Sequence, residues 1–164
     1  MQTLTEKRVF GAKTGVTDIF VATDSGVAAV TVSAAQIGAF GLASREPATA
    51  VAATADRLVV GTDDGMLAAD IDAADRRADV ADPTFAAIGG DMIDAVSAVA
   101  LTPGGLIVAD GNGVVYRGEH AETVTDPPAW ERLGATDGVR AIDAGLLAAA
   151  DGVYRIDDDG LTNT

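Results

Sequence analysis

The stretch Leu58-Val59-Val60-Gly61-Thr62-Asp63-Asp64-Gly65-Met66 consists of two apolar runs on either side of an aspartate–glycine turn. Asp-Gly and Asn-Gly turns between apolar runs favour the positive φ angles of tight β-hairpins, and they are the strongest short-range hairpin signal in a sequence. Similar stretches occur at residues 19–27, 106–114 and 146–153, although the last has a turn one residue tighter. The chain therefore repeats one predicted hairpin four times.

The spacing of these hairpins indicates the architecture. The glycines that follow the turns are 39, 48 and 39 positions apart, at Gly26, Gly65, Gly113 and Gly152. A period of about 40 residues is typical of propeller blades and similar β arrays. Such an array places its hairpin turns at corresponding positions in successive repeats.

Apolar segments around the hairpins extend the repeats to four strands. Seven positions before the leucines at 58, 106 and 146 lie Val51, Val99 and Val139. Fourth strands would follow variable loops, at residues 36–43, 84–89 and 129–134. Four antiparallel strands per repeat define a propeller blade. We therefore predict an all-β, β-propeller-like array of four antiparallel blade-type repeats in one domain, 1–164, with repeats near 7–43, 48–90, 95–134 and 138–164.

The two ends of the chain depart from this pattern. Residues 7–10 would form either the inner strand of the first repeat or the outer strand of the last. The last repeat would have almost no fourth strand after residues 157–160. An array that stops in mid-blade leaves an exposed strand edge, which proteins normally cover. The array would thus be either incomplete or closed by the N-terminal strand, and dimerisation would also cover the edge. A short helix could occupy residues 70–80.

Composition restricts the class of protein. The 164 residues contain no cysteine, so disulfides and thiolate metal sites are excluded. The net charge is −14, from 25 acidic residues, mostly aspartate, against 11 basic ones. Scarce lysine and abundant small apolar residues accompany this charge and indicate a halophilic protein, because molar salt screens the self-repulsion. An acidic protein of a mesophile is the alternative.

The same features bear on partners and location. Nucleic acid is not an expected partner, because a phosphate backbone requires a basic surface. The chain has no long apolar stretch of the kind that spans a membrane. Its first eight residues are polar and unlike a signal peptide, so a cytoplasmic location is expected.

Several segments carry a family resemblance. Residues 60–65 resemble the blade motif of quinoprotein-like and sensor-kinase propellers, without the periodic tryptophans of the quinoproteins, so no cofactor is expected. Residues 7–11, 37–42 and 139–143 resemble an uncharacterised family of haloarchaeal propeller-like proteins, over the whole chain. That resemblance implies a propeller that continues into further repeats, of which this chain would be the first part. It implies no catalytic residue.

Acidic residues recur in the hairpin turns, at Asp24, Asp63, Asp64, Asp110 and Asp151. In a propeller these turns share one face with the loops between blades, which is the usual ligand face. We interpret the aspartates first as turn residues, since Asp accommodates tight turns and caps backbone groups. A site for cations or a basic partner is the alternative. The ligand-face candidates are Asp24, Asp64, Asn112, Asp151, and the inter-blade residues Asp91 and Asp94.

Signals for metal binding or catalysis are weak. The acidic runs at 70–75 and 157–160 do not have the spacing of a calcium loop, so no metal site is predicted. The single histidine, His120, cannot form a multi-histidine zinc site, and Trp130 is expected to pack within a blade. The glycine pairs at 89–90 and 104–105 are interpreted as turns.

The sequence therefore predicts a non-catalytic interaction or scaffold module that binds a protein or small ligand on the loop face. Two alternatives stay open. One is a propeller hydrolase or lyase in which paired carboxylates from different blades meet, one raising the pKa of the other. The other is a truncated fragment of a longer propeller.

Overall fold

The computed structural model describes residues 16–33, 36–71, 83–119, 128–143 and 145–164. Its strands form four antiparallel sheets, each built from strands that are consecutive in sequence. We call these sheets blades 1 to 4. No described segment is a helix that is long and apolar enough to cross a membrane.

Blade 1 contains three described strands, β1 (Val16–Thr23), β2 (Gly26–Ser33) and β3 (Gln36–Ser44). Blade 2 contains β4 (Ala50–Ala53), β5 (Arg57–Thr62), β6 (Gly65–Asp70) and β7 (Ala86–Ile88). A 3-10 turn, η2 (Gly90–Met92), leads into blade 3, which contains β8 (Val96–Thr102), β9 (Gly105–Asp110), β10 (Val114–Gly118) and β11 (Trp130–Ala135). Blade 4 contains β12 (Ala141–Asp143), β13 (Leu146–Ala149), β14 (Gly152–Asp157) and β15 (Gly160–Asn163).

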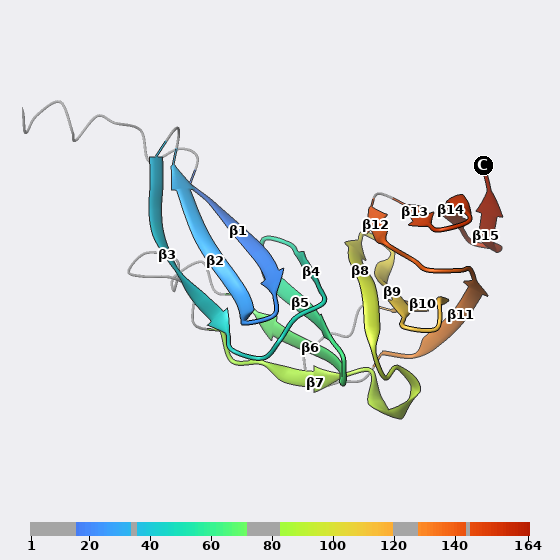
Figure 1. Ribbon diagram of the computed structural model, residues 1–164, viewed down its shortest axis with the longest axis horizontal. Helices are drawn as coiled ribbons and strands as arrows, with labels where there is room; N and C mark the ends of the chain where they lie inside the picture. Colours follow the sequence, from blue (N-terminus) through green and yellow to red (C-terminus); the bar gives the residue numbers. More distant parts are fainter. Residues whose placement is uncertain (1–15, 34–35, 72–82, 120–127, 144) are drawn as a thin grey trace, which may run out of the picture.

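The blades follow one another along the chain, with blades 1 and 4 at opposite ends of the arrangement (Figure 1). Successive blades are in contact, β1 with β4, β4 and β5 with β8, and β8 with β12. Because β1 precedes the hairpin turn at residues 24–25, it corresponds to the second strands β5, β9 and β13 of the other blades. The all-β, blade-type prediction is therefore confirmed. In the part of the chain that is described, the four sheets do not close into a ring.

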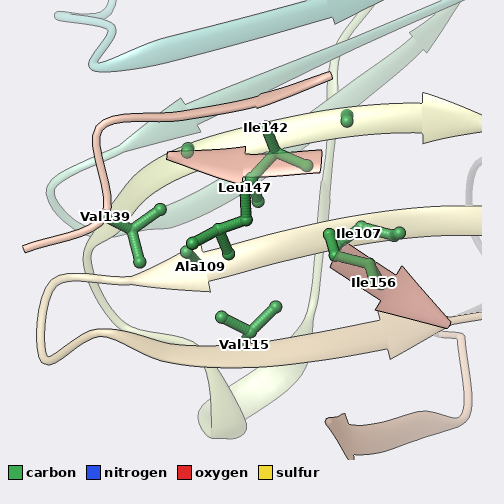
Figure 2. Packing of buried hydrophobic residues seen from close by; sticks show 9 residues of the cluster. Ile107, Ala109, Val115, Val139, Ile142, Leu147 and Ile156 are labelled. Atoms are coloured by element: carbon green, nitrogen blue, oxygen red, sulfur yellow. The ribbon is translucent and has the colours of Figure 1, made fainter. Parts of the chain in front are cut away.

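The hydrophobic core consists of three clusters, each lying between consecutive blades. Alternation along a strand sends neighbouring side chains to opposite faces of a sheet. Leu58 and Val60 of β5 accordingly pack in the cluster shared with blade 1, whereas Val59 packs in the cluster shared with blade 3. Between blades 3 and 4, Figure 2 shows Val115 and Leu147 among the side chains that fill the third cluster. Each inner blade thus buries both of its faces.

Backbone pairing corrects one part of the predicted repeat. Val51 pairs with Val60 and Val99 with Val108, but in blade 4 the corresponding partner of Leu147 is Ile142. Val139 lies before β12 and is not the equivalent of Val51 and Val99. The reason is that the β12–β13 hairpin is shorter: Ile142 and its partner Leu147 are five positions apart, whereas Val51 and Val60, like Val99 and Val108, are nine apart, so counting back from Leu146 overshoots the strand.

Two further expectations about the last repeat are wrong. A fourth strand does follow residues 157–160, because β15 pairs with β14 over Gly160–Asn163. The β13–β14 turn is no tighter than the others, since two residues separate the strands there as they do in blades 1 and 2. The turn that differs is in blade 3, where residues 111–113 intervene.

The predicted fourth strands and glycine turns agree with the structure, and three other predictions concern residues outside the described ranges. The fourth strands predicted at 36–43, 84–89 and 129–134 correspond to β3, β7 and β11. Gly89, Gly90 and Gly105 have positive φ, as expected of turn residues. The N-terminal strand at 7–10, most of the helix suggested for 70–80, and His120 lie outside the described residues.

Candidate functional site

The turns between the second and third strands lie at the same end of the blades as the inter-blade loops. A Cβ atom at Gly65 would lie 3.4 Å from the carbonyl oxygen of Ile93 in the loop between blades 2 and 3. The Gly111 amide donates a 2.9 Å hydrogen bond to the Ala95 carbonyl, and the Ala48 amide a 3.0 Å bond to the Thr23 carbonyl. We call this end, with turns 24–25, 63–64, 111–113 and 150–151 and loops 45–49, 89–95 and 136–140, the loop face.

All six candidate residues lie on the loop face with exposed side chains: Asp24, Asp64, Asp91, Asp94, Asn112 and Asp151. Asp91 belongs to the η2 turn, and the others occupy hairpin turns or the residues after η2. Among the described residues, no three acidic or histidine side chains gather closely enough to hold a metal ion. The candidates therefore form a dispersed acidic surface rather than one convergent site.

The turn chemistry differs between blades. In blades 1 and 2 a threonine stabilises the turn: Thr23 Oγ1 donates to the Gly26 carbonyl at 2.8 Å, and Thr62 Oγ1 to the Gly65 carbonyl at 3.1 Å. In blade 3 the aspartate does so, because Asp110 Oδ1 accepts from the amides of Asn112 and Val114 at 2.9 and 2.8 Å. The prediction that aspartates cap the turns thus holds for Asp110.

Asp151 takes part in a different contact. The Tyr154 hydroxyl donates a 2.8 Å hydrogen bond to Asp151 Oδ2. This bond to the carboxylate is the main reason why the pKa of Tyr154 is raised above its usual 10.0. Asp151 is therefore held by the third strand of its own blade, whereas the carboxylates of Asp24 and Asp64 extend into solvent.

A pocket of about 530 Å³ lies at the opposite end of the blades, between blades 3 and 4. Its lining includes Thr102 and Gly104 from the β8–β9 turn, Arg117 from β10, and Asp143 and Asp158 from blade 4. A smaller pocket, of about 270 Å³, occupies the corresponding place between blades 1 and 2 and includes Asp18 and Phe20. Both of these pockets thus lie away from the predicted ligand face.

The guanidinium of Arg117, which is the cationic group in the lining of the larger pocket, contacts other residues of the protein. Arg117 Nη2 donates a 2.8 Å hydrogen bond to the carbonyl oxygen of Asp157. Its Nη1 lies 3.6 Å from Glu131 Oε2 and 3.9 Å from Asp158 Oδ1. The guanidinium therefore joins β10, β11 and blade 4. Sequence reasoning missed it, although a lone arginine within a strand that otherwise packs in the core was a detectable signal.

The described residues contain no buried pair of carboxylates. Asp110 is the one buried acidic residue among them, and its Oδ1 already accepts two backbone amides. Asp143 and Asp158 both line the larger pocket, but their side chains are exposed.

Trp130 packs against the cluster between blades 2 and 3, as predicted. Its indole Nε1 is buried without a hydrogen-bond partner in the described structure. It therefore serves as a packing residue rather than as an exposed platform for a ligand.

The blades, their hairpin turns and the inter-blade core define a β-propeller-type repeat protein. The chain belongs to the HVO_0234-like beta-propeller family, whose model matches residues 3–164. This match confirms the resemblance to a haloarchaeal propeller-like family. A search of curated proteins finds no match.

Proposed function

We propose that the protein is a non-catalytic interaction module of a halophilic cytoplasm, and that it binds a partner through the loop face. The observation that supports this most directly is the exposure of all six candidate residues on turns and loops of one end. These turns connect strands whose other side chains are buried between blades. Binding residues on loops held by a rigid scaffold are a common arrangement.

The charge of the loop face indicates the chemistry of the partner. Five of the six candidate side chains are aspartates, and the whole chain carries a net charge of −14. A basic protein surface or a cationic small molecule would complement it. At molar salt the Debye length is about 3 Å, so recognition would depend on direct contacts rather than on long-range attraction.

A ligand in the pocket between blades 3 and 4 is the second candidate function. The pocket is large enough for a small molecule, at about 530 Å³, and drug-sized ligands occupy pockets of about 300–1,000 Å³. Its lining carries Arg117 and two exposed carboxylates. The intramolecular contacts of Arg117 make this site less available than the loop face.

Affinity capture from a haloarchaeal lysate at about 2 M KCl tests the proposal with two matched variants. One variant changes Asp24, Asp64, Asp91 and Asp94 to asparagine on the loop face. The control changes four exposed acidic residues at the opposite end to their amides, at Glu119, Asp143, Asp158 and Asp159. Both lose four negative charges, so a general effect of charge is matched.

The proposal predicts a partner that the wild-type protein and the control variant capture and the loop-face variant loses. Loss of the partner by the control variant alone would place the binding site at the pocket end and contradict the loop-face proposal. A reproducible lack of any partner would contradict the interaction role itself.

A further inference from the structure

The paired strands define equivalent positions in the blades. One position of the second strand holds a valine in blades 1, 2 and 3, at Val21, Val60 and Val108. Val21 and Val60 each lie two residues before the threonine that ends the strand. Val108 pairs with Val99 as Val60 pairs with Val51. Val60 and Val108 are 0% exposed, because they face the preceding blade. Val21 is 45% exposed. Blade 1 therefore presents the residues of an inter-blade interface with no blade described in front of them.

Most of the rest of this surface is also apolar. Cross-strand partners share one face of a sheet, and the pairing places three rows across β1, β2 and β3 on the face turned away from blade 2. Phe40, in the middle row, is 78% exposed. We call this surface the blade 1 end face: Thr17, Val32 and Ile37; Ile19, Val30 and Phe40; Val21, Ala28 and Leu42.

None of these nine residues is charged, although 22% of the whole chain is. A chain that carries a net charge of −14 would be expected to place some acidic residues on a face exposed to solvent. Exposed apolar patches of this kind mark interaction surfaces. The composition of the blade 1 end face thus indicates that another apolar surface covers it.

Blade 4 presents the opposite half of the same interface. Val153 occupies the third-strand position of Val27, Met66 and Val115, each of which is buried against the following blade. Val153 itself is 46% exposed. Leu146 occupies the second-strand position of Val59 and Ile107. Val59 and Ile107 are buried, whereas Leu146 is exposed. We call the surface around Leu146 and Val153 the blade 4 end face.

The two end faces correspond to the two sides of the contact that joins successive blades within the chain. The blade 4 end face also carries Asp143 and Arg155 in the row of Leu146, and Arg155 corresponds to Arg117, which contacts the following blade from blade 3. We propose that the blade 4 end face of one copy packs against the blade 1 end face of a second copy, in the manner of the internal inter-blade interfaces. A second copy offers an opposite half to each of the two end faces at once. Two such contacts related by a two-fold axis close the assembly as an eight-bladed ring, and propellers of four to eight blades are typical.

Light scattering of the full-length chain in about 2 M KCl tests this pairing. The wild-type protein is expected at twice the 16.4 kDa mass of the chain. Phe40→Glu and Val153→Glu each place a charge within the contact, and burying an unpaired charge is costly, so each should weaken dimerisation by roughly tenfold or more. Met92→Glu is the matched control, because Met92 is 57% exposed but lies on the loop face.

Mixing the two variants distinguishes head-to-tail pairing from other dimers. Phe40→Glu retains an intact blade 4 end face, and Val153→Glu retains an intact blade 1 end face. One native contact can therefore form in the mixture, which should associate more tightly than either variant alone. Circular dichroism checks that each variant is folded.

Four results would overturn the proposal. They are a wild-type monomer at about 100 µM in molar salt, a dimer that neither end-face variant weakens, a dimer that Phe40→Glu alone weakens, and an assembly larger than a dimer. The third would indicate pairing of two blade 1 end faces. Loss of the loop-face partner would not affect any of these results, so the pairing and the proposed function fail separately.

Discussion

Arg117 of blade 3 donates a 2.8 Å hydrogen bond to the backbone carbonyl oxygen of Asp157 in blade 4. This contact connects two blades through a cationic side chain that is 21% exposed. A hydrogen bond to a charged group contributes about 1.5–3 kcal/mol, and partial exposure reduces that figure here. We therefore expect Arg117→Ala to lower the free energy of unfolding by about 1–2 kcal/mol.

Urea unfolding in about 2 M KCl measures this effect. Arg132→Ala is the control, because Arg132 lies on the neighbouring strand β11 with an exposed side chain. Arg117→Lys should give an intermediate loss, since an ammonium retains the charge without the planar fork of donors. Equal unfolding free energies for Arg117→Ala and Arg132→Ala would show that the inter-blade contact contributes nothing.

Leu58 tests whether the clusters between blades form the stabilising core. Its side chain is fully buried between blades 1 and 2. Leu→Ala changes at such positions cost about 2–5 kcal/mol through lost apolar burial and the remaining cavity. Met92→Ala, at an exposed loop position, should change stability by less than about 0.5 kcal/mol. Similar losses for both variants in urea unfolding would contradict an inter-blade core.

The Asp110 side chain should contribute more to the free energy of unfolding than the side chain of Asp64, which lies in the corresponding turn of blade 2. Asp110→Ala leaves the amides of Asn112 and Val114 without the acceptor they have now, at an expected cost of about 1–3 kcal/mol. Asp110→Asn should recover part of the loss, because an amide oxygen can accept the same bonds. Asp64→Ala, at an exposed turn position, is the control. If Asp64→Ala lowered the free energy of unfolding more than Asp110→Ala, the conclusion that Asp110 stabilises its turn and Asp64 does not would be wrong.

The Tyr154–Asp151 contact predicts a pH dependence. The hydrogen bond to Asp151 raises the pKa of Tyr154 above 10.0, so the folded chain holds the phenol proton more tightly than the unfolded chain. The contact therefore stabilises the protein fully below the usual tyrosine pKa. That contribution is lost as the pH rises through the raised value.

Ultraviolet titration of the phenolate measures this shift in a Tyr116→Phe background, which leaves Tyr154 as the one tyrosine. Asp151→Asn should bring the pKa of Tyr154 closer to 10.0, whereas Asp24→Asn in blade 1 should have no effect. If Asp151→Asn leaves the titration midpoint unchanged, the hydrogen bond is not the cause of the shift.

The sequence pattern predicts the blades well because the hairpin turns are a local signal. Asp, Asn and Gly occur where positive φ is required, as at Gly65, whose φ is 129°. The register of blade 4 was mispredicted for an equally physical reason. Distances counted along the chain assume hairpins of equal length, and the shorter β12–β13 hairpin moves the inner position from Val139 to Ile142.

The candidate site was predictable only in part. Which residues lie in turns follows from local chemistry, and this places all six candidates on one face. Whether an aspartate caps its turn depends on whether it occupies the last position of the second strand. In blade 2 Thr62 stabilises the turn, so Asp64 extends into solvent, whereas blade 3 has Asp110 at the corresponding place. The pocket beside Arg117 forms where blades 3 and 4 pack together. Local sequence patterns do not predict this packing.

Blades 1 and 4 are not neighbours among the described residues, and we propose that a second copy brings their end faces together. Since the chain has no cysteine, the variant Val21→Cys with Val153→Cys carries one thiol on each end face. Facing sheets pack about 10 Å apart, so a bis-maleimide of about that span can join the two thiols. Met92→Cys with Val153→Cys is the control pair.

Denaturing electrophoresis after cross-linking in about 2 M KCl then separates the alternatives. We expect a cross-linked product at twice the 16.4 kDa chain mass for the end-face pair, and little for the control pair. A product confined to single chains would show that blade 4 closes onto blade 1 of its own chain, and the absence of any product would show that the two end faces do not meet. Either result would rule out the proposed pairing of two copies.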